Sequence, residues 1–230
     1  TQLKKARLKL KTGFFEGLKI LLTKPYVMGI FVVATGYEII STILEYQMNW
    51  IATGIYSTPA KFATFTAYQA MGINIVALIF ALVGTSYFMR KFGLKFCIMS
   101  FPIVIGFIIT GILLTKNFEI SSYQLMWTLL GSMIAIKGLN YAFNKPSMEV
   151  LYIPTSNDIK FKSKGWIDTF GNRSTKGIGA AISNTFKHSL PQLFLYGSII
   201  SLGIVGIWTV IAALTGNKFQ KLQEDNNIIE

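Results

Sequence analysis

Cysteine and histidine are nearly absent from this chain of 230 residues, which holds one of each. The single Cys97 excludes an intrachain disulfide and any metal site built from several cysteines. The single His188 has no metal-ligand partners nearby, so we interpret it as a polar residue near a membrane interface. We therefore expect no metal site and no resident cofactor.

Motifs of soluble enzymes are missing as well. A P-loop has the form G-x-x-x-x-G-K-[ST] and follows a strand. The nearest stretch, GNRSTKG at 171–177, departs from that form and follows no predicted strand. The sequence therefore disfavours ATP hydrolysis by a P-loop, and it holds no clustered catalytic group that would indicate an enzyme.

Charged residues are scarce, and acidic ones most of all. They make up 14% of the chain, against roughly 25% in an ordinary globular protein. Apolar residues make up 52%, and the mean hydropathy is +0.48. This composition disfavours a soluble enzyme, a disordered tail and a nucleic-acid-binding module, so we expect no nucleic-acid partner despite the net charge of +12.

Long apolar blocks are what the sequence does contain. A membrane-spanning helix needs about 20 mostly apolar residues. Four blocks meet this plainly, a fifth spans but carries Lys137 and Asn140, and a sixth is polar. The sequence thus predicts an all-α integral membrane protein, in which a lipid bilayer surrounds six transmembrane helices, at 26–46, 68–88, 96–114, 123–143, 165–186 and 190–214.

Basic residues between these blocks predict the orientation. Cytoplasmic loops carry an excess of lysine and arginine. From the N-terminus the connections hold seven, one, three, one, four, one and two basic residues. This alternation favours six spans with both termini in the cytoplasm, or in the matrix or stroma of an organelle.

The same pattern divides the chain into three parts. These are a basic cytoplasmic segment (1–25), a six-helix membrane domain (26–216) and a polar cytoplasmic tail (217–230). The stretch 152–164 reads as a cytoplasmic loop, because it is polar and basic and contains a proline. The membrane would be a bacterial inner membrane or the inner membrane of an organelle.

Ionisable residues inside the predicted spans are the candidate site, because such groups usually face a cavity or a partner. Glu38 and Glu45 lie seven residues apart, about two helical turns, and so share one face of the first span. Lys137 shares a face of the fifth span with nearby asparagines. Asp168 and Lys176 share a face of the sixth span, with Arg173 beside it.

Two interpretations of these charges remain open. In the first, Glu38 pairs with Lys137 or Lys176 and only fixes how the helices pack. In the second, Lys137, Arg173 and Lys176 line a water-filled cavity that attracts a polyanion such as a nucleotide phosphate. Glu38 and Glu45 would then balance the charge or gate the cavity.

One segment carries a resemblance to a known family. Residues 144–180 (NKPSMEVLYIPTSNDIKFKSKGWIDTFGNRSTKGIGA) resemble the ATP/ADP translocases of plastids and obligate intracellular bacteria. That family has P-x-K-E-x-x-Y-I-P, then K-x-K, then D-x-x-G-x-x-x-x-K-x-x-G-A. YEIISTILE at 37–45 and the turn RKFG at 90–93 are also similar to family patterns. The likeness covers most of the chain.

The resemblance implies the C-terminal six helices of a twelve-helix carrier of the major-facilitator type, an antiporter that exchanges ATP for ADP by alternating access. In the family, the residues that match Glu45 and Lys176 are important for nucleotide transport. Glu38 stands where the family usually has a glycine, and Met148 stands where it usually has a lysine. The partner would be a second six-helix half, in the same or a separate chain. The alternative is a non-transporting structural subunit of a multisubunit membrane complex.

Overall fold

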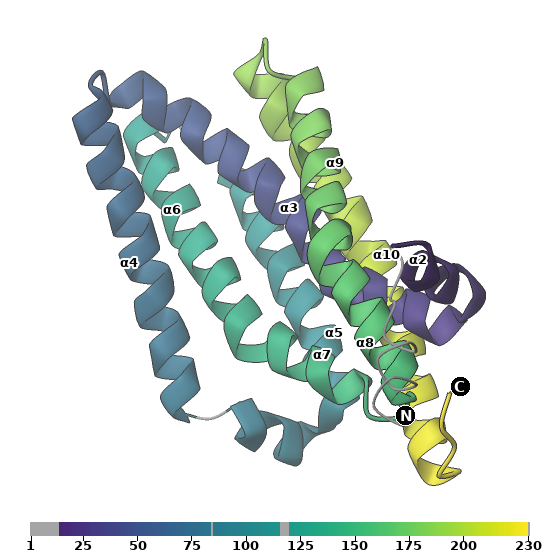
Figure 1. Cartoon of the computed structure of the whole chain (residues 1–230). Helices are drawn as coiled ribbons and strands as arrows, with labels where there is room; N and C mark the ends of the chain where they lie inside the picture. The colour runs from purple at the N-terminus through teal and green to yellow at the C-terminus, as the bar shows by residue number, and fades with distance from the viewer. Residues whose placement is uncertain (1–13, 84, 116–119, 230) are drawn as a thin grey trace, which may run out of the picture.

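The computed structural model describes residues 14–83, 85–115 and 120–229, which are almost entirely helical (Figure 1). The basic run Lys4–Lys11 and Lys116 lie outside these residues. The elements, in chain order, are α2 (Phe14–Thr23), α3 (Pro25–Ile55), α4 (Pro59–Val83), α5 (Thr85–Leu114), α6 (Ser122–Leu139), η2 (Asn140–Asn144), α7 (Lys145–Leu151), α8 (Asn157–Trp166), η3 (Ile167–Gly171), α9 (Asn172–Thr185) and α10 (Leu190–Glu224).

Four of these helices are long and apolar enough to cross a membrane: Pro25–Ile55, Pro59–Phe80, Met89–Leu114 and Leu190–Glu224. They correspond to the four plainly apolar blocks, and the all-α membrane class is confirmed. The fifth and sixth predicted spans are helical too, but they are not among those four. Each of the two contains one turn of π-helix, η2 or η3. The count of six spans stays a prediction.

Two stretches outside the predicted spans are also helical in part. The prediction of a loop at 152–164 is wrong from Asn157 onward, because α8 begins at that residue. The Ser156 hydroxyl accepts a hydrogen bond from the Ile159 amide and so caps this helix, while Ile159 is buried. In the C-terminal part, α10 continues to Glu224. Beyond it, Ile229 forms an isolated parallel bridge with Thr155.

The predicted RKFG turn lies where α5 is interrupted. Gly93 has φ 79° and ψ 160°, a conformation that only glycine adopts without strain. A helix cannot continue through this geometry, so the chain changes direction between the segment before Gly93 and the one after it.

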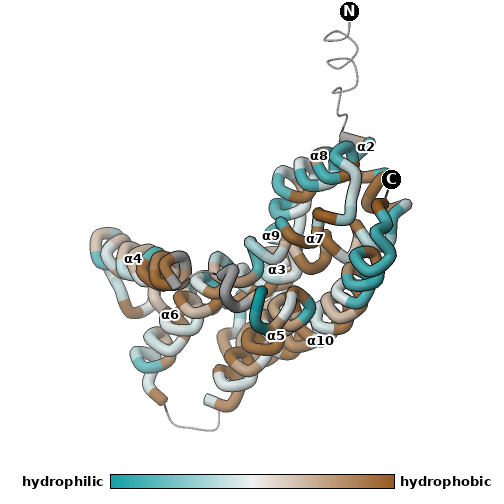
Figure 2. The backbone as a smooth tube through the Cα atoms, turned by 90° about the horizontal axis from the view of Figure 1, so that it is seen from below, coloured by the Kyte–Doolittle hydropathy of each residue, from teal (hydrophilic) through white to brown (hydrophobic). Residues whose placement is uncertain are grey.

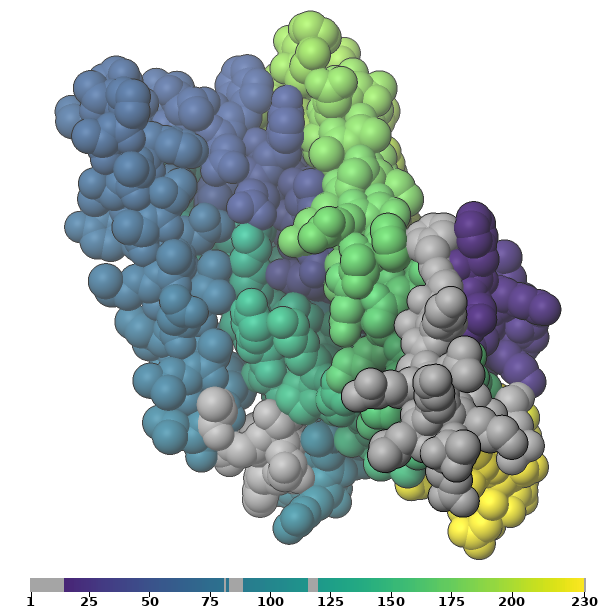
Figure 3. Space-filling view, viewed as in Figure 1, coloured from purple at the N-terminus to yellow at the C-terminus, as the bar shows by residue number. Residues whose placement is uncertain are grey.

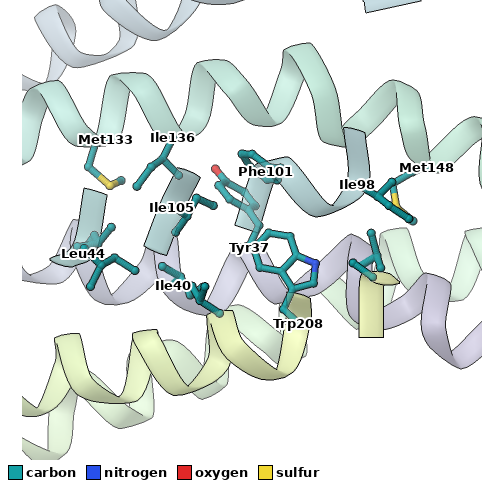
Figure 4. Close-up of a cluster of buried hydrophobic side chains, with 14 of the residues drawn as sticks. Tyr37, Ile40, Leu44, Ile98, Phe101, Ile105, Met133, Ile136, Met148 and Trp208 are labelled. Atoms are coloured by element: carbon teal, nitrogen blue, oxygen red, sulfur yellow. The ribbon is translucent and has the colours of Figure 1, made fainter. Parts of the chain in front are cut away.

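The core surrounds α3, which packs against α6, α9 and α10, while α5 packs mainly on α10 (Figures 1 and 4). Trp208 of α10 is buried against Gly36 of α3, where an added Cβ would lie 3.1 Å from the indole. Its ring also meets Phe101 of α5 edge-on, at a centroid distance of 5.5 Å. Lipid is as apolar as these side chains, so close van der Waals packing is what holds such helices together in a membrane.

The outer helices leave one face of the bundle hollow. Seen from below, the α4–α6 pair and the α8–α9 rod form two arms on either side of α3 and α5 (Figure 2). Helix α4 packs mainly on α6, and only 11% of its most apolar stretch is buried. The space-filling view looks onto the hollow between α4 and α9 (Figure 3). This face positions the site.

Candidate functional site

Two adjoining cavities open on the hollow face. The first has a volume of about 670 Å³ and is lined from α3, α4, α6–η2–α7 and α9. The second has a volume of about 450 Å³ and lies between α3, η2–α7 and the α8–η3–α9 rod. Glu38, Asn140 and Lys145 line both. The charged and amide side chains of the first cavity are Glu38, Glu45, Asn74, Lys137, Asn140, Lys145 and Lys176.

Glu45 and Lys137 form an ion pair across the α3–α6 contact. The Lys137 Nζ donates a hydrogen bond to Glu45 Oε2 over 2.9 Å. The side chains keep exposed fractions of 21% for Lys137 and 41% for Glu45, because both border the cavity. A ligand entering the cavity can therefore reach both charges.

Glu38 and Lys176 form a second ion pair, across the α3–α9 contact. The atoms Glu38 Oε2 and Lys176 Nζ lie 3.5 Å apart. The close approach of α9 to α3 depends on Gly179, where an added Cβ would lie 2.8 Å from the Ile39 carbonyl oxygen. Lys176 comes one turn before this glycine, so the helix contact holds it opposite Glu38.

The geometry has features of both interpretations of these charges, the one in which they fix helix packing and the one in which they line a cavity. Glu38 is paired with Lys176, as the packing interpretation allows, and both ion pairs also line the cavity. Partly exposed pairs of this kind contribute only about 0–1 kcal/mol to stability, since water competes for each partner. Their position at the cavity is therefore more informative than their contribution to folding.

The other two predicted site residues lie elsewhere. Asp168 of η3 lines the second cavity, together with Glu149 and Lys164, which are ion-paired with each other. Arg173 is exposed on α9 and is not among the residues that line either cavity. The structure thus brings Glu38, Glu45, Lys137 and Lys176 together and leaves Arg173 outside the group.

Several cavity residues were missed from the sequence. Lys145 was counted only as a basic residue of a cytoplasmic loop, and Lys164 as such a residue and as part of the K-x-K pattern. Asn74 lies within a block interpreted as apolar. The one sequence signal that could have pointed to Lys145 was its spacing from Lys137 along a helix. In an unbroken α-helix, a residue eight positions later is turned by about 80°, which places Lys145 off that face. The wider turn of η2 reduces this offset.

Helix α2 packs against α8, the part of the α8–η3–α9 rod that precedes the predicted span at 165–186. Lys162 of α8 forms ion pairs with Glu16 of α2 at 2.9 Å and with Asp158 at 2.8 Å. The hydrogen bonds to Asp158 and Glu16 raise the pKa of Lys162 above its ordinary value. Gly17 lets the helices touch, since a Cβ there would lie 2.8 Å from the Lys162 carbonyl oxygen.

Metal chemistry has no evident basis in the described part of the chain. These residues contain no group of three histidine, cysteine, aspartate or glutamate side chains that could hold a metal ion. What the cavities offer instead is a set of ammonium and carboxylate groups facing one another. Such groups bind and release charged solutes without covalent chemistry.

Apolar helices around a hollow lined with paired charges define a helical integral membrane protein with a charged cavity. The sequence profile of one such family, described as TLC ATP/ADP transporter, matches residues 1–219. The chain therefore belongs to this family, and the resemblance noted from its residues is confirmed.

Individual relatives agree with this assignment. ADP,ATP carrier protein 2, chloroplastic, of Arabidopsis thaliana is 26% identical, over 99% of this chain and 39% of its own length. ADP,ATP carrier protein 1 of Rickettsia typhi is 23% identical, over 98% of this chain and 49% of its own length. The chain thus spans less than half the length of these relatives. No solved structure matches it.

Proposed function

We propose that this chain is the C-terminal half of a nucleotide carrier that exchanges ATP for ADP across a membrane by alternating access. The observation that carries the proposal is the pair of ion pairs, Glu45–Lys137 and Glu38–Lys176, facing one cavity of about 670 Å³. Cavities that bind small molecules have volumes of about 300–1,000 Å³, so the space suits a nucleotide.

The lysines bind the phosphate chain and the glutamates compete with it. When a nucleotide enters, its phosphates take over Lys137 and Lys176, and the two carboxylates lose their partners. When it leaves, the ion pairs form again, so that Lys137 and Lys176 each regain a carboxylate partner in the empty cavity. The weakness of partly exposed pairs makes this exchange reversible.

Arg173 and Asp168 have supporting roles in the proposal. Arg173 is exposed one turn before Lys176 on α9, where it adds a positive charge near the route to the cavity. Asp168 adds a negative charge to the second cavity. Nucleotide is the transported substrate, and no cofactor takes part.

A second six-helix half would close the hollow face. Carriers of this type bind substrate at the middle of the membrane, between two halves that rock against each other. Support comes from the relatives, which are more than twice the length of the matched region. In this arrangement both ends of the chain lie on the cytoplasmic, matrix or stromal side of a bacterial or organelle inner membrane.

The test begins with the whole protein that contains this chain, purified from its native membrane in mild detergent. Mass spectrometry identifies what accompanies it, and uptake of labelled ATP and ADP is measured in proteoliposomes. We expect a second six-helix half and counter-exchange, with uptake reduced at least tenfold by Lys176→Gln.

A matched control is Lys218→Gln, at an exposed lysine of α10 that lines neither cavity. This variant should transport like the unaltered protein. Many stoichiometric subunits and no nucleotide uptake would instead support the structural-subunit alternative.

A further inference from the structure

Lys145 occupies the junction of the two cavities. It is the first residue of α7 and one of three residues that line both spaces. The other two are Glu38, which is paired with Lys176, and the buried Asn140. Lys145 therefore lies within reach of a ligand in either cavity.

Lys145 also differs from the other cavity lysines in having no carboxylate within ion-pair distance. Asp168, which also lines the second cavity, attracts Lys145 only over a longer range. Lys137 pairs with Glu45, Lys176 with Glu38 and Lys164 with Glu149. Among the described residues, no carboxylate oxygen lies within 4.0 Å of the Lys145 ammonium. An anion can therefore bind Lys145 without first breaking an ion pair.

An aromatic ring holds this ammonium in place. The Lys145 Nζ lies 4.2 Å from the centroid of the Tyr141 ring. A cation over a ring face is attracted to it but keeps its charge. Tyr141 is 48% exposed and lines the first cavity, so the ring and the ammonium together face the hollow.

The π-helical turn η2 creates this arrangement. Lys145 follows η2 directly, and its amide donates a hydrogen bond to the Asn140 carbonyl in the wide pattern of a π-helix. Such turns are rare and occur often at functional sites. Here the turn brings Lys137 and Lys145, two turns apart on one rod, to the same cavity.

We propose that Lys145 is a substrate-binding residue that takes the phosphate chain of the nucleotide and favours longer chains over monophosphates. This inference rests on the proposed nucleotide exchange. A chain of two or three phosphates extends from Lys137 and Lys176 in the first cavity to Lys145 at the junction. A single phosphate reaches only part of this distance and gains less from the third cation.

The test uses the whole carrier in proteoliposomes, with labelled ATP displaced by unlabelled ATP, ADP or AMP. We expect Lys145→Gln to weaken ATP and ADP binding about ten- to hundredfold, the effect of one charge-assisted hydrogen bond. AMP binding should change much less, so that the preference for ADP over AMP shrinks. Lys145→Arg should restore most of that preference, and Lys218→Gln should leave it unchanged.

Three results would overturn the inference. The first is Lys145→Gln with unaltered ATP affinity and an unaltered ADP-to-AMP ratio, while the unaltered protein still exchanges nucleotides. The second is an equal loss for ATP, ADP and AMP together with a lower melting temperature, which indicates a structural role. In the third, the unaltered protein binds no nucleotide, and the proposed function fails with the inference.

Discussion

The Lys137 ammonium lies 2.9 Å from the Glu45 carboxylate, and both side chains face the cavity between the arms of the bundle. Helix α3 carries the glutamate and α6 the lysine, and the two residues are 92 positions apart in the chain. A pair of this kind joins two helices and also offers a charge to a ligand.

The Glu45–Lys137 pair should matter more for transport than for folding. In the double variant Glu45→Gln, Lys137→Gln, we expect a change of at most about 1 kcal/mol in stability, because the pair is partly exposed. Nucleotide exchange should fall at least tenfold, since the cavity loses a phosphate-binding cation. Thermal unfolding and uptake in proteoliposomes measure the two effects.

The single variants complete a double-mutant cycle for this pair. Glu45→Gln and Lys137→Gln each leave one charge without its partner and should therefore cost more stability than the double variant. An unstable double variant with a normal transport rate per folded molecule would show that the pair serves packing alone.

Removing the competitor of Lys176 should tighten substrate binding. In Glu38→Gln the lysine keeps its position but loses its carboxylate partner, 3.5 Å away in the structure. We expect nucleotide affinity to rise by up to about fivefold, the equivalent of a pair contributing about 1 kcal/mol. Turnover should slow, because the empty cavity then keeps an unbalanced cation. Equilibrium binding and initial rates of exchange measure the two.

Ser41→Ala is the matched control, since Ser41 lines the same cavity on the same helix, carries no charge and donates a hydrogen bond to the Glu38 backbone carbonyl. It should change neither affinity nor turnover. If Glu38→Gln weakened binding as Lys176→Gln does, the competition between carboxylate and phosphate would be refuted.

The contact between α9 and α3 should tolerate no side chain at Gly179. An added Cβ would lie 2.8 Å from the Ile39 carbonyl oxygen and 2.9 Å from the Thr42 Cβ. We expect Gly179→Ala to cost about 1–3 kcal/mol, the usual effect of overpacking, and to move Lys176 away from Glu38. Thermal unfolding in detergent measures the loss of stability.

Gly165→Ala is the control for the general effect of replacing a helical glycine, because no atom lies within 4 Å of an added Cβ there. It should leave the melting temperature unchanged or raise it, since alanine favours the helix. Equal behaviour of the two variants would contradict the close contact at Gly179.

Helix α2 should separate from α8 when Gly17 is enlarged. A Cβ at Gly17 would lie 2.7 Å from the Trp166 Cβ and 2.8 Å from the Lys162 carbonyl oxygen. We expect Gly17→Leu to expose α2 to hydrogen exchange and proteolysis while the spans stay folded. Glu16→Gln removes one ion pair and should have a much smaller effect. Protection of α2 that is identical in both variants would contradict this contact.

Much of the fold follows from local sequence patterns. The apolar blocks predict the four helices that are long and apolar enough to span a membrane, because about 20 apolar residues in a helix match the thickness of the hydrocarbon core. The start of α8 was missed because its residues are polar on average, and hydropathy does not detect a helix capped by Ser156 that buries little besides Ile159 and Ser163.

The candidate site could be predicted in part. Spacing within one helix places Glu38 and Glu45 on the same face of α3, and both line the first cavity. It also favours a shared face for Asp168 and Lys176, yet the structure divides these two between the cavities. Lys145 was overlooked because a π-helical turn has no clear signal in a single sequence.

The sequence by itself determined that this is a membrane protein with charges inside its apolar helices, because hydropathy and helical spacing are local properties. Only the tertiary structure decided that Lys137 pairs with Glu45 and Lys176 with Glu38. Pairing depends on how far each helix is shifted and rotated against its neighbours. Contacts such as Gly179 against Ile39 set those shifts, and they join residues more than a hundred positions apart.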